Sequence, residues 1–71
     1  NSTSELKAKF PGKITKIFVG LGKVKSGDTL VSMEAMKMEF VYTAPKDMEI
    51  IKILVQENQN VDKGQEFFQW Q

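Results

Sequence analysis

The segment SMEAMKMEF, residues 32–40, places one lysine among three methionines near the middle of the 71-residue chain. The side-chain amine of Lys37 is a nucleophile that forms amides with activated carboxyl groups, so this residue is a candidate point of covalent attachment for an arm. The flanking Met36 and Met38 are unbranched and polarizable, which suits them to shallow recognition surfaces. A lysine that only solvates a turn is the alternative. The choice between the two depends on the elements that carry the segment.

The composition excludes most familiar catalytic sites. The sequence contains no cysteine and no histidine, so it lacks thiolate and imidazole metal ligands, a Cys or His nucleophile and a histidine base. Ten lysines against nine acidic residues leave a net charge of +1, without the broad field that binding to nucleic acid or anionic membranes usually needs. No apolar run approaches the length of a membrane span. We therefore expect a soluble single domain that binds neither nucleic acid nor a membrane. The absent initiator methionine and the polar first residues suggest that it was excised or processed from a longer chain.

The first half of the chain resembles the second half in two segments, which predicts two copies of one supersecondary unit. Residues 13–19, KITKIFV, align with residues 49–55, EIIKILV. Residues 24–30, VKSGDTL, then align with residues 61–67, VDKGQEF. The matched pairs are Ile14 with Ile50, Lys16 with Lys52, Ile17 with Ile53, Val19 with Val55, Val24 with Val61, Gly27 with Gly64 and Leu30 with Phe67.

Both copies are typical of β-strands, because their segments are short, rich in β-branched residues and separated by turn residues. Strand alternation puts three residues of each copy on one face: Thr15, Ile17 and Val19 in the first, and Ile51, Ile53 and Val55 in the second. The lysines between them mark the outward side. The sequence therefore predicts an all-β sandwich or small barrel.

The run from Thr29 to Thr43 contains no Gly, Pro, Asn or Asp and joins the two copies. Its residues around Lys37 favour a helix on local propensity alone. A strand of that length is unusual, however, so two strands with a bend at Met36 and Lys37 fit the repeat better. If an approximate two-fold axis relates the copies, this bend lies at one end and the chain termini at the other. The amine would then stand on an exposed tip.

The hexapeptide EAMKME resembles the attachment motif of biotinyl domains, the biotin carboxyl carrier modules of biotin-dependent carboxylases. Its residues are Glu34, Ala35, Met36, Lys37, Met38 and Glu39. The likeness also takes in Gly12 before the first strand, Ala44 and Pro45 after the bend, and Gly64. It therefore covers nearly the whole chain.

This resemblance implies a flattened barrel or sandwich of two four-stranded antiparallel sheets with internal two-fold symmetry. Residues 1–7 would be a flexible N-terminal segment and residues 8–71 the biotinyl domain. Lys37 would carry covalent biotin, with Glu34, Ala35, Met36, Met38 and Glu39 as the flanking recognition motif. Glu34 and Glu39 are expected to keep the tip soluble or to contact the modifying enzyme, rather than to act as an acid/base pair.

The resemblance also implies the partners. A biotin protein ligase would attach biotin, and the arm would carry a carboxyl group from a biotin carboxylase site to a carboxyltransferase site. The domain itself would be non-catalytic, with no catalytic residues and no metal, and monomeric when isolated. Its location would be cytoplasmic, or the mitochondrial or another organellar matrix in a eukaryote, and not secreted.

Several positions depart from the family pattern. Met48 stands where the family usually has glycine, Phe10 precedes Pro11 where alanine is common, and the first loop, VGLGKV, is one residue short. The chain has no inserted thumb of the kind found in bacterial acetyl-CoA carboxylase, and Ala35 stands where the eukaryotic acetyl-CoA carboxylases usually have valine. An acyl-CoA, pyruvate or related carboxylase is favoured as the parent.

Two other classes of protein compete with this interpretation. Lipoyl domains share the implied fold, but their motif has an acidic residue before the lysine, where this chain has Met36. A small nucleic-acid-binding barrel would use stacking aromatics such as Phe67, Phe68 and Trp70 in a basic groove. The near-neutral charge offers no phosphate footprint, so these aromatic residues are expected to belong to the core.

Overall fold

The computed structural model describes residues 6–71, which form seven β-strands and no α-helix. The strands are β1 (Gly12–Ile17), β2 (Gly22–Val24), β3 (Thr29–Ala35), β4 (Met38–Thr43), β5 (Met48–Ile53), β6 (Asn60–Val61) and β7 (Phe68–Trp70). Every strand pair is antiparallel. Within the described residues, no helix is long and apolar enough to cross a membrane.

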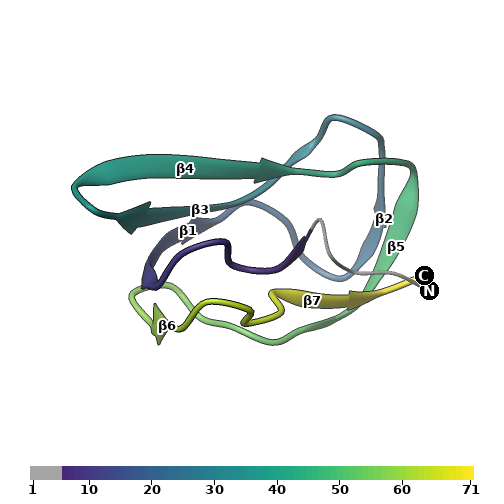
Figure 1. The fold of residues 1–71 in the computed structure, drawn as a ribbon. Coiled ribbons are helices and arrows are strands. Elements are labelled where there is room, and N and C mark those ends of the chain that lie inside the picture. The colour runs from purple at the N-terminus through teal and green to yellow at the C-terminus, as the bar shows by residue number, and fades with distance from the viewer. Residues whose placement is uncertain (1–5) are drawn as a thin grey trace.

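The strands form two sheets, which confirms the predicted all-β sandwich (Figure 1). One sheet has four strands in the order β4-β3-β1-β6, and the other has three in the order β2-β5-β7. An isolated bridge between Lys7 and Glu66 takes the place of an eighth strand beside β7. The N–H of Phe67 donates to the carbonyl of Leu6, and that of Ala8 donates to Gln65. This segment leaves the edge after one bridge, so it forms no regular ladder.

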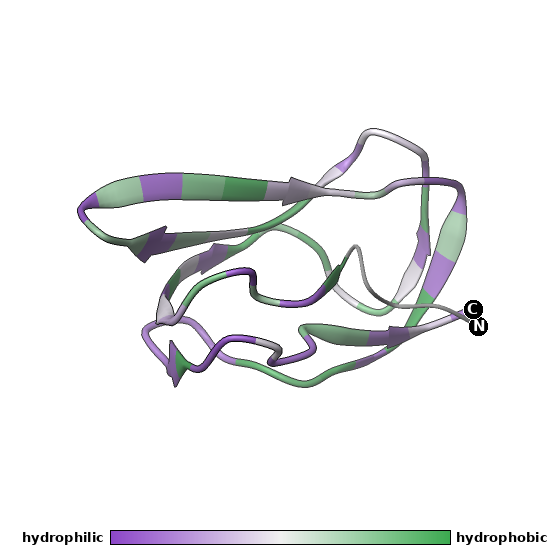
Figure 2. Ribbon diagram, viewed as in Figure 1, coloured by the Kyte–Doolittle hydropathy of each residue, from purple (hydrophilic) through white to green (hydrophobic). Residues whose placement is uncertain are grey.

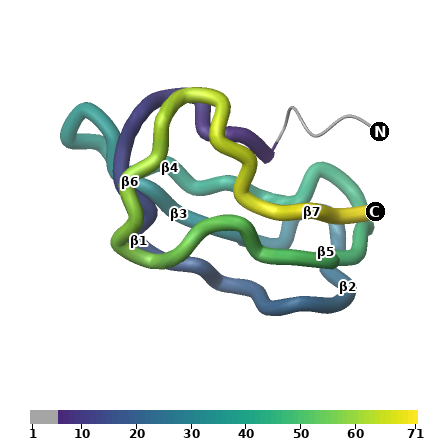
Figure 3. Tube along the Cα trace, turned by 90° about the horizontal axis from the view of Figure 1, so that it is seen from below, coloured from purple at the N-terminus to yellow at the C-terminus, as the bar shows by residue number. Residues whose placement is uncertain are grey.

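The two sequence repeats exchange their short middle strands. β6 of the second repeat pairs with β1, through Gly12 opposite Val61, while β2 of the first repeat pairs with β5, through Met48 opposite Val24. Figure 3 shows β6 beside β1 and β2 beside β5, at opposite ends of the molecule. Each repeat therefore completes the sheet of the other, and the predicted duplication is a property of the fold.

The alternation predicted for the first strand of each repeat is wrong at one position. The β1–β3 register shifts between Ile14 and Lys16, and the β5–β7 register shifts between Ile50 and Lys52. A bulge adds one residue to the strand and reverses the faces of the residues beyond it. Thr15 therefore makes a partly buried hydrogen bond with Ser32 of β3 instead of facing the core, and Ile51 is 45% exposed.

The core lies between the two sheets and draws on both repeats. Its largest fully buried side chains are Phe67, Phe68, Leu6, Ile14, Leu30, Met33, Ile50 and Val31. Tyr42 meets Phe67 edge to face, with ring centroids 4.8 Å apart. The expected placement of Phe67, Phe68 and Trp70 in the core is confirmed. Figure 2 shows hydrophobic and hydrophilic residues interleaved along the strands, as a sheet with one buried face requires.

The predicted flexible segment, residues 1–7, lies largely outside the described residues. Of its members, Leu6 and Lys7 are described. Leu6 is fully buried, and Lys7 makes the bridge to Glu66. The described chain is therefore fastened to the sandwich from its first residue.

Candidate functional site: the β3–β4 hairpin

A two-residue turn of Met36 and Lys37 joins β3 to β4, where the sequence predicts the bend. Their φ angles are 55° and 63°, and positive φ at both central residues is the signature of a type I′ hairpin turn. Neither residue favours this conformation, since a side chain in the left-handed region costs about 1–2 kcal/mol. The ladder from Thr29–Thr43 to Ala35–Met38 holds the turn in place.

The turn stands at one end of the molecule, and the C-terminus lies at the other (Figure 1). Lys37 is exposed, and its ammonium group makes no hydrogen bond or ion pair with any residue from 6 to 71. A nucleophilic amine is therefore presented on an exposed hairpin tip, at the opposite end of the molecule from the C-terminus.

The three methionines of the motif fall into two environments. Met33 is fully buried in the core, whereas Met36 is 66% exposed and Met38 is 58% exposed. Together these two side chains form a small exposed apolar patch on both sides of the amine of Lys37. The exposure of Met36 and Met38 agrees with their expected place at the tip, whereas the sequence analysis made no statement on the burial of Met33.

Glu34 and Glu39 lie directly opposite each other on β3 and β4. The hydroxyl of Thr15 donates to Oε2 of Glu39 at 2.8 Å, and the hydroxyl oxygens of Thr15 and Ser32 are 2.6 Å apart. Because the single hydroxyl proton of Thr15 is given to Glu39, Ser32 is the donor to Thr15. This chain of hydrogen bonds crosses three strands and ties the base of the hairpin to β1.

Sequence reasoning did not find Thr15 or Ser32 as part of the site. They lie 17 residues apart along the chain, and only the bulge in β1 turns Thr15 toward Ser32. No local pattern of residue types marks such a pair. Among the described residues, no group of three or more His, Cys, Asp or Glu side chains could hold a metal ion.

Gly12 lets β1 approach β3 immediately before the turn. A Cβ atom built at this position would overlap the carbonyl oxygen of Glu34, and would lie 2.8 Å from Met33 Cε and 3.0 Å from Ala35 Cβ. Glycine is therefore required here by space, not by backbone angle. The close approach fixes the position of Ala35, the residue that enters the turn.

Met48 occupies the position in the second repeat that Gly12 occupies in the first. Its side chain is buried, and it pairs with Val24 as Gly12 pairs with Val61. Next to Met48, Trp70 of β7 lies opposite Ile50 of β5, and the backbones of Gln71 and Glu49 exchange two hydrogen bonds. Met48 thus adds a side chain to the core at the position where the first repeat has none.

The other two departures also have structural outcomes. The ring of Phe10 packs against Phe40 of β4, with centroids 5.2 Å apart, so the aromatic residue before Pro11 supports the hairpin strand. The short first loop ends at Gly22, whose φ is 121°. A residue with a side chain rarely adopts that angle, so glycine closes the loop where the second repeat uses Asn58 at φ 69°.

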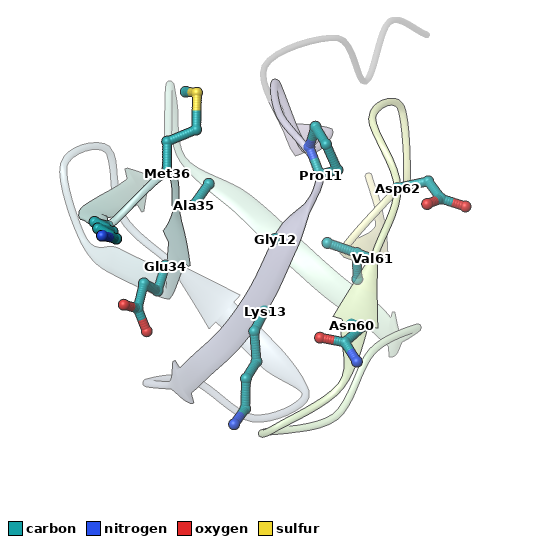
Figure 4. Close-up of a pocket in the computed structure, with 10 residues that line it drawn as sticks. Pro11, Gly12, Lys13, Glu34, Ala35, Met36, Asn60, Val61 and Asp62 are labelled. Carbon is teal, nitrogen blue, oxygen red and sulfur yellow. The ribbon is translucent and has the colours of Figure 1, made fainter.

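A groove of about 440 Å³ opens beside the turn, across the ends of β3, β1 and β6 (Figure 4). Its lining residues are Pro11, Gly12, Lys13, Glu34, Ala35, Met36, Lys37, Asn60, Val61 and Asp62. Lys13 is in register with both Glu34 and Asn60, and Figure 4 shows these three side chains projecting to the same side of the sheet. The attachment candidate Lys37 thus forms part of the wall of a groove.

The fold and the site together define a class of protein: a small duplicated antiparallel sandwich that presents one lysine on a tight hairpin turn. The model of the biotin/lipoyl attachment family described as "Biotin-requiring enzyme" matches residues 11–69. The chain belongs to this family, and the resemblance drawn from the motif is confirmed.

The matched relatives are much longer than this chain. The alpha subunit of mitochondrial methylcrotonoyl-CoA carboxylase from Mus musculus is 44% identical over 57 residues, which covers 79% of this chain and 8% of that protein. Pyruvate carboxylase from Aspergillus niger is 38% identical over 61 residues, 84% of this chain and 5% of that protein. The gamma subunit of methylmalonyl-CoA decarboxylase from Veillonella parvula is 49% identical over 43 residues, 59% of this chain and 33% of that subunit.

A solved carboxylase structure contains a region with the same fold as this chain. A single-chain, multi-domain long-chain acyl-CoA carboxylase superimposes with a TM-score of 0.83 and 29% sequence identity. The match covers 92% of this chain and 7% of that chain. The fold described above is thus also found as a small part of a multi-domain acyl-CoA carboxylase.

Proposed function

We propose that this chain is a biotin carboxyl carrier domain and that Lys37 is its site of covalent biotin attachment. The observation that carries the proposal is the exposed, unpaired amine of Lys37 on a type I′ turn within Ala-Met-Lys-Met, in a chain of the biotin-requiring family. Met36 and Met38, exposed beside the amine, are the contacts proposed for the modifying ligase. Glu34, Ala35 and Glu39 complete the motif at the base of the hairpin.

Attachment forms one amide bond. The Lys37 amine attacks the activated carboxyl carbon of biotin, the activating group leaves, and the nitrogen loses a proton and its positive charge. The turn suits this reaction because an exposed hairpin tip can enter the ligase active site without local unfolding. The ligase is a biotin protein ligase.

The function of the modified domain is transport. The arm receives a carboxyl group at a biotin carboxylase site and delivers it at a carboxyltransferase site, on the same chain or on partner subunits. Tethering holds the arm at high effective concentration at both sites, so the intermediate does not diffuse through solvent. The domain is non-catalytic in this scheme. A location in the cytoplasm or in an organellar matrix follows from those partners.

The parent enzyme proposed is a carboxylase of the acyl-CoA or pyruvate type. The relatives named above include proteins called methylcrotonoyl-CoA carboxylase and pyruvate carboxylase. Lipoylation of Lys37 is the competing modification, because the family includes lipoyl domains. The methionine at position 36, where lipoyl domains have an acidic residue, favours biotin.

The test is the mass of the chain after co-expression with a biotin protein ligase. The wild-type chain is expected to gain the mass of one biotinyl group, and Lys37→Arg is expected to gain none. Lys23→Arg, a substitution of an exposed lysine in β2 in the other sheet, serves as the matched control and should be modified normally. An unmodified wild-type chain, or biotin on a different lysine, would overturn the proposal.

A further inference from the structure

We propose that the groove beside the turn is a docking site for the ring of the arm on Lys37, a neutral bicyclic ring that carries a cyclic urea. The inference rests on the proposed function and deepens it by assigning the arm a resting position on its own domain. Asn60 and Asp62, on the far wall of the groove, are its proposed polar contacts.

The groove lies within reach of the arm. Lys37 itself forms part of the near wall, and the far wall is β6, two strands away from β3 in the order β3-β1-β6. Strands are spaced about 4.8 Å apart, so the walls are separated by roughly 10 Å. The four methylenes of lysine and the chain of biotin between its carboxyl group and its ring are together longer than this when extended. The ring can therefore reach β6 with the arm folded back over β1.

The lining of the groove matches a neutral ring. Once Lys37 is acylated and has lost its charge, the charged lining residues are Lys13, Glu34 and Asp62, and the two carboxylates can accept hydrogen bonds from the N–H groups of the urea. The apolar side chains of Ala35 and Val61 lie between them, and Figure 4 shows Val61 directed from β6 toward β1. Gly12, at the centre, lets β1 lie close against β3 and Ala35.

The second repeat provides an internal comparison. A groove of about 420 Å³ lies at the equivalent place, lined by Lys23, Val24 and Lys25 of the first repeat together with Asp47, Met48, Glu49 and Gln71. Since Val24 corresponds to Val61, Lys23 and Lys25 correspond to Asn60 and Asp62. Lysine can only donate hydrogen bonds, whereas an amide and a carboxylate accept them from the N–H groups of a urea. The two repeats thus differ at the residues that would recognise the ring, and the acceptors lie at the end that carries Lys37.

Weak binding is sufficient for this role. A short flexible linker gives an effective concentration of the order of millimolar, so a site with a dissociation constant in that range would be occupied about half of the time. Such a site shields the apolar part of the ring from water but releases it readily to an active site. Seven of its lining residues, among them Lys37 and Asn60, are exposed to solvent, which suits a transient contact.

The experiment compares amide chemical shifts of the unmodified and biotinylated domains, after mass spectrometry has confirmed one biotin on Lys37. Shift changes are expected at Gly12, Lys13 and Val61 as well as at the turn, together with nuclear Overhauser contacts between the ring and the Val61 methyl groups. In the double variant Asn60→Ala/Asp62→Ala, the changes at Gly12 and Val61 and the contacts should be lost. Both substituted residues are exposed, and the unmodified spectrum of the variant reports whether its fold is intact.

The matched control is Lys23→Ala/Lys25→Ala, which alters the equivalent residues of the other repeat. In this variant, biotinylation should cause the same shift changes at Gly12 and Val61 as in the wild type. Biotin on Lys37 with shift changes confined to residues 35–38 would overturn the docking site while leaving the carrier function standing. Equal losses in both double variants would overturn it as well. A chain that carries no biotin on Lys37 would overturn the proposed function itself.

Discussion

The hydroxyl of Thr15 donates a 2.8 Å hydrogen bond to the carboxylate of Glu39, and so joins β1 to β4 across the intervening β3. Ser32 of β3, buried between them, completes the connection through its own hydrogen bond to Thr15. These hydrogen bonds act together with the β1–β3 ladder and the packing of Phe10 on Phe40 to hold the hairpin that carries Lys37. This relationship gives Glu39 a structural role at the base of the tip in addition to its place in the motif.

Thr15→Val should therefore destabilise the domain. The substitution keeps the shape of the side chain but leaves the buried Ser32 hydroxyl without its partner, which costs about 1–3 kcal/mol. Urea denaturation monitored by Trp70 fluorescence would measure the change in the free energy of unfolding. Thr43→Val, at an exposed position of β4, is the control and should stay within about 0.5 kcal/mol of wild type. Similar losses in the two variants would show that the hydrogen bonds of Thr15 contribute nothing.

Gly12→Ala should destabilise the domain and alter the position of the turn, although residue 12 is not part of the turn. An added methyl group overlaps the carbonyl oxygen of Glu34 and pushes β3 away from β1, at a typical overpacking cost of about 1–3 kcal/mol. We expect lower stability and slower biotinylation of Lys37, measured by thermal unfolding and by ligase assay.

Gly20→Ala is the matched control for Gly12. A Cβ atom at position 20 meets nothing within 4 Å, and the backbone there is not in the left-handed region. This variant should be unchanged or stabilised by a few tenths of a kcal/mol, because alanine reduces the entropy of the unfolded chain. A Gly12→Ala protein as stable as the Gly20→Ala protein would contradict the close approach of β1 and β3.

Met36→Asn should stabilise the hairpin and impair its recognition. Asparagine tolerates the φ of 55° that Met36 adopts, so we expect a gain of roughly 0.5–1 kcal/mol in the free energy of unfolding. The same change removes one of the exposed apolar contacts beside Lys37, so labelling by a ligase should slow. Met36→Leu, which keeps an apolar side chain and the strain, should show no gain in stability. A stabilised Asn variant that is labelled at the wild-type rate would deny Met36 a role in recognition.

Alanine substitutions should separate the two kinds of methionine in the motif. Met33→Ala removes a fully buried side chain and should cost about 2–5 kcal/mol of stability. Met38→Ala removes a side chain that is 58% exposed and should change stability by less than about 0.5 kcal/mol, while slowing biotinylation. Chemical denaturation and a ligase assay on the same two proteins make the comparison. Comparable stability losses would show that Met38 contributes to packing as well.

The position of the attachment candidate could be predicted because its signals are local. The repeat, the β-branched segments and the length of the run from Thr29 to Thr43 together place a bend at Met36 and Lys37, and the structure confirms it. The motif around Lys37 is equally local, so the family could be identified from the sequence.

The rest of the site was decided by tertiary structure. The sequence by itself determined an all-β duplicated fold, a bend and an amine at the bend. Only the folded chain decided that a bulge turns Thr15 toward Glu39, that Gly12 must lack a side chain, that Met33 is buried, and that β6 supplies the far wall of the groove. The physical reason is the same in each case: these features arise from contacts between residues distant in the chain, and the spacing of residue types along a strand does not report which strand will lie beside it.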